Sequence, residues 1–213
     1  IGGFMRQLTA LLSLGILLTI SGCATLSESQ CVASDWQTVG YRDGMNGTHH
    51  AQLLKHQNAC VKHGVTPDRT AYMDGWNDGV VQYCQPDNGF AAGERGAAYA
   101  NVCPDYLKDA FYAAYQDGRQ LHLAQVEIND MNRAISQKAH GLEHLKKEIS
   151  ATEALLIEGD LTSLERRELL DETKELAKEQ GQLETEIEAL KIDVAVKTER
   201  LANLRHKLVY ASY

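Results

Sequence analysis

Residues 128–156 of this 213-residue chain read INDMNRAISQKAHGLEHLKKEISATEALL, and their apolar pattern decides the fold of the second half. Apolar side chains recur every seven residues, at Ile128, Ile135, Leu142, Ile149 and Leu156, with Met131 and Leu145 at the intervening offset of three. This heptad repeat is typical of a coiled-coil helix, and the polar residues Lys138 and Thr152 interrupt it. The pattern predicts a helix over residues 121–157.

A second helix with a matching repeat is expected over residues 163–209. Glu158-Gly159-Asp160-Leu161 ends the first repeat, and Thr162-x-x-Glu165 has the form of a capping box that begins a helix. One seven-residue series comprises Leu169, Leu176, Leu183, Leu190 and Leu204, broken by Lys197, and a parallel series comprises Ile187, Val194, Leu201 and Leu208. We expect residues 119–213 to fold into an antiparallel coiled-coil hairpin. The alternative is that the same seams join two chains into a dimer or a four-helix bundle.

Residues 31–118 differ in composition and predict a separate, cysteine-rich helical domain. They hold Cys31, Cys60, Cys84 and Cys103, whereas residues 119–209 hold no cysteine and no proline. An even number of cysteines in an exported chain indicates two disulfides, and three pairings are possible. We favour Cys31–Cys60 with Cys84–Cys103, because each bridge would join neighbouring segments. A zinc site is the alternative, and the spacing contains no C-x-x-C pair that would favour it.

A degenerate repeat predicts three short helices in this domain. Its copies are Gly40-Tyr41-Arg42-Asp43-Gly44, Gly75-Trp76-Asn77-Asp78-Gly79 and Ala114-Tyr115-Gln116-Asp117-Gly118. A small residue four positions before a glycine lies on the same helix face, where another backbone can approach closely. The closing glycine suits a left-handed helix C-cap. We expect the three aspartates to cap turns or to hydrogen-bond there, rather than to form a metal or acid–base cluster. Glycines 89, 93 and 96 are interpreted as packing positions, because they do not fit a phosphate-binding loop.

No residue pattern indicates catalysis, so we expect a protein that is not an enzyme and uses no cofactor. His56 and His63 are weak candidates for a metal site, since they flank Cys60 at helical spacing, but an oxidised Cys60 could not be a ligand. The formal charge of −8, without a basic block, argues against a nucleic-acid partner.

The first 30 residues predict an exported lipoprotein. Residues 1–4 precede Met5 and are interpreted as read-through or a gene-call artefact, and residues 5–22 have the charged start and short apolar run of a signal peptide. Ile20-Ser21-Gly22-Cys23 resembles a bacterial lipobox, so Cys23 is expected to carry diacylglycerol and an N-acyl chain that anchor the protein in the membrane. Residues 23–30 would then be a lipidated linker. Ala24 after the cysteine favours the outer membrane facing the periplasm, with the inner membrane as the alternative.

The order of aromatic, glycine and cysteine positions resembles a known family. Cys31-x4-Trp36-x3-Gly40-Tyr41-x-Asp43-Gly44, His56-x3-Cys60-x2-His63-Gly64, Tyr72-x2-Gly75-x3-Gly79-x3-Tyr83-Cys84, Asn88-Gly89-x3-Gly93-x2-Gly96-x2-Tyr99 and Cys103-Pro104 together are similar to the domain of unknown function numbered 2799, a family of proteobacterial lipoproteins. The resemblance covers residues 31 to about 120 and implies an envelope lipoprotein with a small cysteine-bridged domain. It carries over no catalytic residue.

The expected function is therefore that of a structural or interaction protein of the cell envelope. The hairpin would act as an adaptor or spacer arm, and its partner would be another envelope protein or a second copy of the chain. The alternative is a module in the cysteine-rich domain that binds a small ligand or a metal.

Overall fold

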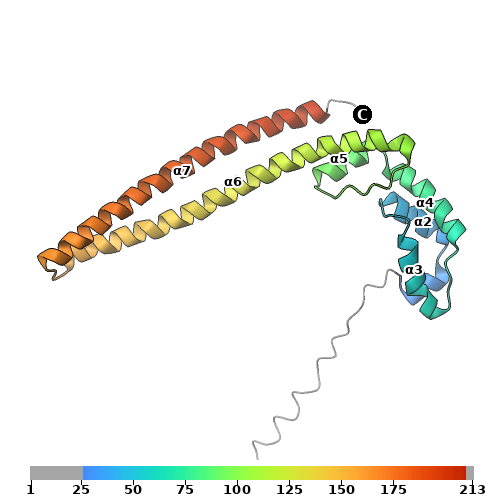
Figure 1. The fold of residues 1–213 in the computed structure, drawn as a ribbon, viewed down its shortest axis with the longest axis horizontal. Helices are drawn as coiled ribbons and strands as arrows, with labels where there is room; N and C mark the ends of the chain where they lie inside the picture. The colour runs from blue at the N-terminus through green and yellow to red at the C-terminus, as the bar shows by residue number, and fades with distance from the viewer. Residues whose placement is uncertain (1–25, 210–213) are drawn as a thin grey trace, which may run out of the picture. The chain divides into compact units, whose positions relative to one another are not determined.

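A computed structural model describes residues 26–209 of the chain, and within this range it is mainly helical (Figure 1). The helices are α1 (Glu28–Ala33), α2 (Trp36–Met45), α3 (Gln52–Cys60), the 3₁₀ helix η1 (Val61–His63), α4 (Arg69–Tyr83), α5 (Pro86–Glu94), α6 (Asp105–Glu158) and α7 (Ser163–Val209). The predicted fold class, a disulfide-bridged helical region followed by a long helical hairpin, is confirmed. The described residues divide after Val80 into two compact units, called unit 1 (26–80) and unit 2 (81–209) below.

The start of the chain falls outside the described residues, so the artefact at 1–4, the signal peptide at 5–22 and lipidation at Cys23 stay predictions. None of the helices in the described range is both long and apolar enough to cross a membrane.

The predicted linker over residues 23–30 is wrong where the structure describes it. Leu26 is buried, and Ser27 begins helix α1 with a capping box in which Ser27 N donates to Gln30 Oε1 at 2.8 Å. The disulfide between Cys31 and Cys60 holds α1 against α3, with the two Cα atoms 5.4 Å apart. The chain is therefore part of the folded unit from Leu26 onward.

Unit 1 is built around a close contact between α2 and α4. A Cβ atom added at Gly40 would lie 1.9 Å from the carbonyl oxygen of Tyr72, and one at Gly75 would lie 1.9 Å from the carbonyl oxygen of Gln37. Gly44 and Gly79 lie similarly close to the facing backbone. The paired glycines allow the two backbones to touch, so the packing interpretation of the repeat is correct.

Unit 2 contains the same kind of contact between α5 and α6. A Cβ atom at Gly93 would lie 2.1 Å from the carbonyl oxygen of Tyr115, and one at Gly118 would lie 2.0 Å from that of Phe90. Gly89 also faces α6, at Phe111. The third copy of the repeat thus has a partner in the glycines at 89 and 93. The second disulfide, Cys84–Cys103, joins the residue before α5 to the segment that connects α5 and α6.

The predicted C-cap role of the repeat glycines is wrong. Gly44 lies inside α2, whose C-cap is Asn46, and Gly79 and Gly118 lie inside α4 and α6. Among the described glycines, positive φ values occur at Gly47, Gly64 and Gly96 instead. The repeat glycines lack a side chain because a second backbone occupies its place.

Helix α6 also differs from the prediction at its start. The composition predicts a boundary at Arg119 and a helix that begins near 121, but α6 is one helix of 54 residues that begins at Asp105. Pro104 is its N-cap, and no proline follows within it. The change in composition at Arg119 marks a change of packing partner, from α5 to α7, along an unbroken helix.

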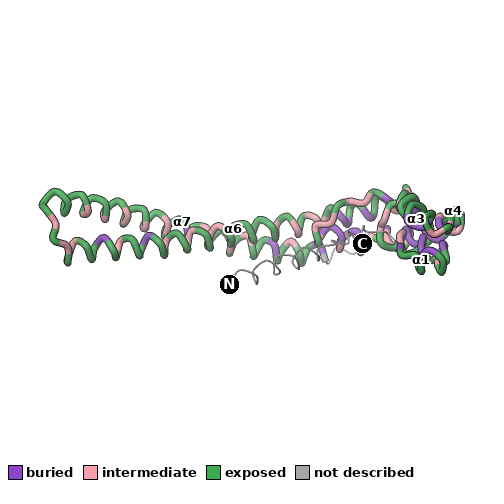
Figure 2. The backbone as a smooth tube through the Cα atoms, turned by 90° about the horizontal axis from the view of Figure 1, so that it is seen from below, coloured by how far each residue is buried: buried purple, intermediate pink, exposed green. Residues whose placement is uncertain are grey.

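Helices α6 and α7 run side by side as the predicted antiparallel hairpin (Figure 1). The least exposed positions follow the predicted seams, and Ile128, Leu145, Ile187, Leu201 and Leu208 are buried (Figure 2). Leu121, Ile128, Leu201 and Leu208 form a core cluster with Phe90 of α5 packed against it.

The polar interruptions of the seams contribute to the hairpin. Thr152 is buried and donates to the carbonyl oxygen of Glu148, 2.9 Å away in its own helix. Lys138 Nζ lies 2.6 Å from Glu186 Oε2, and Lys197 Nζ lies 2.8 Å from Glu127 Oε1. Both ion pairs cross between the helices in one consistent register, so these lysines favour one alignment of the two arms.

Candidate interaction surface

The tip of the hairpin is a short turn that its own hydrogen bonds hold in place. Gly159 N donates to the carbonyl oxygen of Leu155 at 2.9 Å, which ends α6. At the start of α7, the backbone N–H and the hydroxyl of Thr162 donate to Glu165 Oε2 at 2.8 and 2.7 Å, and Glu165 N donates back to the hydroxyl at 3.3 Å. The predicted capping box is therefore present. These hydrogen bonds stabilise the ionised carboxylate and lower the pKa of Glu165.

One further hydrogen bond ties the two arms together at the tip. The guanidinium Nη1 of Arg166 donates to the carbonyl oxygen of Leu156 at 2.5 Å, so an orphan carbonyl of the last turn of α6 is satisfied from α7. The turn between the arms is thus fixed from both sides.

The fixed tip presents apolar side chains to solvent. Leu155, Ile157 and Leu164 are 55%, 82% and 65% exposed. We call these three residues the tip patch. Glu158 and Ser163 lie between them in sequence and are also exposed. Single exposed apolar residues are ordinary on a protein surface, but here three lie within ten residues at the end of an arm. This concentration makes the tip the candidate interaction surface.

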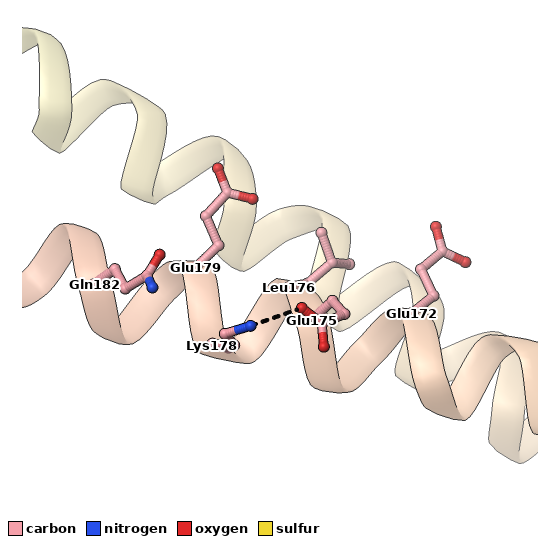
Figure 3. Close-up of a pocket in the computed structure, with 6 residues that line it drawn as sticks. All are labelled: Glu172, Glu175, Leu176, Lys178, Glu179 and Gln182. Atoms are coloured by element: carbon pink, nitrogen blue, oxygen red, sulfur yellow. Dashed lines mark hydrogen bonds and ion pairs between the residues drawn. The ribbon is translucent and has the colours of Figure 1, made fainter.

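A second feature of the hairpin lies on α7 (Figure 3). It is a depression of about 410 Å³ lined by Glu172, Glu175, Leu176, Lys178, Glu179 and Gln182, and Figure 3 shows Lys178 bonded to Glu175, a contact of 3.2 Å. All six residues come from one helix and most are charged, so the depression has no enclosing walls. We interpret it as a solvated helix face.

The cysteine positions singled out from the sequence form two disulfides. The structure pairs Cys31 with Cys60 and Cys84 with Cys103, the local pairs that the sequence analysis favours. Cys31, Cys60 and Cys84 are buried. None of these sulfurs is then free to coordinate a metal ion.

His56 and His63, the two weak metal candidates, do not belong to a group of potential metal ligands in the described residues. His56 is 3% exposed, and its Nε2 lies 2.8 Å from Asp43 Oδ2. His63 lies partly exposed beside Glu28, with Nδ1 3.5 Å from the carboxylate. Over residues 26–209, no three histidine, cysteine or acidic side chains are grouped as metal ligands would be. Each of these two histidines therefore has a carboxylate beside one ring nitrogen.

Asp43, His56 and Tyr72 form a buried polar cluster that sequence reasoning missed. The hydroxyl of Tyr72 donates to Asp43 Oδ2 at 2.8 Å, the same oxygen that faces His56. Burial, followed by the hydrogen bond to Asp43, raises the pKa of Tyr72 well above its ordinary value, so the phenol stays protonated. The cluster connects α2, α3 and α4, which suits a structural role.

The three repeat aspartates have separate surroundings. Asp43 belongs to the buried cluster, Asp78 is exposed on α4, and Asp117 lies on α6 in unit 2, where it accepts a hydrogen bond from Gln120 at 3.2 Å. They do not cap turns as predicted, because each lies within a helix.

A small recess of about 260 Å³ in unit 1 is lined by Asp35, Gln37, Thr38, Tyr41, Gly75 and Asp78.

The comparison with protein families identifies the cysteine-rich region. Residues 35–120 match the model of the family described as "Protein of unknown function (DUF2799)". This stretch is a DUF2799 domain. The match runs from the N-cap of α2 into α6, so the DUF2799 domain includes both glycine-paired helix contacts, and α7 lies outside it. No curated protein and no solved structure matched the chain in the other two comparisons.

Proposed function

We propose that the chain is an envelope lipoprotein in which the DUF2799 domain forms the base and the α6–α7 hairpin acts as an adaptor or spacer arm. The observation that carries this proposal is the tip patch, Leu155, Ile157 and Leu164, displayed at the end of a fixed turn. Burying an apolar side chain contributes roughly 1.5–3 kcal/mol when it is removed fully from water, so even partial coverage of three such residues supports binding.

The location belongs to the same proposal. Cys23 carries the lipid, the preceding residues 5–22 are removed as a signal peptide, and Ala24 directs the protein to the periplasmic face of the outer membrane. The two disulfides support an oxidising compartment, because such bonds persist in exported proteins. Mass spectrometry of the mature N-terminus, together with membrane fractionation of wild type and Cys23→Ser, tests the anchor.

The partner is another envelope protein with an apolar groove rimmed by basic residues. The tip carries Glu153, Glu158, Asp160, Glu165 and Glu168 against Arg166 and Arg167, so its charge is predominantly acidic. Complementary charge at the rim of an interface favours encounter and the correct register. We expect no catalysis and no nucleic-acid partner.

Photo-crosslinking in cells tests the arm. A crosslinking residue at Glu158 or Ser163 places the reactive group within the tip, and exposed Gln137 and Asn203 serve as controls along the arm. One recurrent envelope protein captured from the tip positions and not from the controls would support the adaptor. Capture of only a second copy of the chain would instead identify the hairpin as an oligomerisation device. If nothing were captured, the recess lined by Asp35 and Asp78 would become the candidate ligand site.

Arm length provides a second test of the spacer role. Removing residues 142–148 from α6 and 177–183 from α7 deletes one heptad from each arm, keeps the seams in phase and shortens the arm by about 10 Å. The Lys138–Glu186 and Glu127–Lys197 pairs are retained. A spacer would lose its tip crosslinks in this double deletion, while thermal stability would stay near that of wild type. Deleting only residues 142–148 is the control that breaks the register.

A further inference from the structure

The end of unit 1 formed by α1, α3 and η1 exposes apolar side chains beside the first disulfide. Val32, Leu54 and Val61 are 69%, 62% and 63% exposed. Val32 follows Cys31 and Val61 follows Cys60, so with the cysteine Cα atoms 5.4 Å apart the Cα atoms of these valines are no more than about 13 Å apart. These three side chains are called the basal patch.

Lysines accompany the basal patch at the same spacing. Leu54 and Val61 are seven residues apart on the continuous α3–η1 segment, which places them on one face about 10 Å apart. Lys55 and Lys62 directly follow them and are exposed. An exposed aliphatic stripe bordered by lysines is the pattern of a surface that rests at a membrane interface, since lysine stems cover apolar surface while their ammonium groups reach the phosphates. Glu28 on α1 lies beside this end and faces His63.

The chain before α1 connects this end of unit 1 to the proposed anchor. Only Ala24 and Thr25 separate Cys23 from Leu26, which is already buried in unit 1. Four residues at full extension from Cys23 to Ser27 and one helical turn to Cys31 add up to about 20 Å. A lipid on Cys23 therefore holds the Cys31–Cys60 disulfide within roughly 20 Å of the headgroups.

We propose that the basal patch lies on the phospholipid surface of the membrane that holds the lipidated Cys23, so that unit 1 docks on the bilayer. This proposal rests on the lipid anchor of the proposed function, which holds unit 1 near the membrane. The exposed side chains of Val32, Leu54 and Val61 provide the surface that contacts the lipid. The occupant is phospholipid rather than protein, because a two-residue tether leaves little room for a protein between this end of unit 1 and the headgroups.

Quenching of an added tryptophan by brominated lipid tests the contact. The full-length lipidated protein is placed in vesicles of phosphatidylethanolamine and phosphatidylglycerol, with or without brominated acyl chains. Leu54→Trp reports on the basal patch, and Ile192→Trp, at a position 64% exposed on α7, is the matched control. Trp36 and Trp76 are buried and give a constant background. We expect roughly half of the added emission of Leu54→Trp to be quenched, and that of Ile192→Trp to be unchanged, because an interfacial apolar face enters the acyl boundary.

A binding experiment without the lipid separates this proposal from the anchor. Mature Cys23→Ser protein is expected to bind the same vesicles weakly, and Leu54→Ser with Val61→Ser should reduce that binding about tenfold, while Ile192→Ser should not. Equal quenching at Leu54→Trp and Ile192→Trp in protein shown to be lipidated would overturn the basal patch and leave the anchor intact. Mass spectrometry that finds Cys23 unmodified would overturn the anchor. Selective quenching of Leu54→Trp in the Cys23→Ser protein would support the patch without the anchor. Val61→Trp repeats the measurement if Leu54→Trp does not fold.

Discussion

Replacing Gly93 by alanine tests the helix contact that organises unit 2. The new Cβ would lie 2.1 Å from the carbonyl oxygen of Tyr115 and 2.7 Å from Arg119 N, so α5 must retreat from α6 by about 1 Å to restore an ordinary contact. Overpacking of this kind costs about 1–3 kcal/mol. Alanine is a better helix former than glycine, which offsets up to about 1 kcal/mol of this cost. We therefore expect a net loss of about 1–2 kcal/mol in the free energy of unfolding.

The same substitution at Gly141 and Gly181 is the matched control. A Cβ atom at either position meets nothing within 4 Å, so alanine should stabilise α6 or α7 by about 0.5–1 kcal/mol. The opposite signs separate Gly93→Ala from the controls by roughly 5–10 °C in melting temperature for a chain of this size. Circular dichroism melting of the oxidised full chain measures it. If Gly93→Ala raised the melting temperature as much as Gly141→Ala does, the close approach of α5 and α6 would be wrong.

Three further perturbations address other contacts. Replacing Cys84 and Cys103 together by alanine should cost about 3 kcal/mol, measured by chemical denaturation, because the unfolded chain is no longer closed over this loop; an unchanged midpoint would contradict the bridge. The raised pKa of Tyr72 means that the folded chain keeps a proton that the unfolded chain releases above pH 10, so stability should fall as pH rises beyond 10. In Tyr72→Phe, the melting temperature should fall less steeply with pH in that range, and an unaltered slope would refute this. Lys138→Glu should weaken the hairpin by less than about 1 kcal/mol, because the pair with Glu186 is largely exposed, and the exchange Lys138→Glu with Glu186→Lys should restore it; no recovery in the double variant would speak against the observed register.

The hairpin was predictable because its information is local and periodic. Heptad spacing identifies the side of each helix that is buried, and the Thr162–Glu165 pair marks where α7 starts within a residue. Lys138 and Lys197 were predicted as interruptions because a sequence pattern cannot show which charge faces them. The structure supplies Glu186 and Glu127 from the opposite arm.

The base was harder to predict because its contacts depend on pairs of distant segments. The repeat at Gly40, Gly75 and Ala114 indicated close helix approach, but a glycine that faces another backbone and a glycine that ends a helix look alike in sequence. Gly89 and Gly93, which face the third copy of the repeat, were recognised only as packing glycines. The Asp43, His56 and Tyr72 cluster joins three helices, and no spacing along the chain indicates it.

The unbroken helix α6 links the stability of the base to the position of the tip. The family match ends at residue 120, inside α6, and about 40 further residues of the same helix reach Glu158, a distance of about 60 Å. At that distance a tilt of about 5° in α6 displaces the tip by about 5 Å, which exceeds the tolerance of a specific contact. The glycine contacts between α5 and α6 therefore fix where the tip patch points within unit 2. Gly93→Ala should accordingly weaken tip crosslinking from Glu158 at temperatures where the protein is still folded, whereas Gly141→Ala should leave it unchanged.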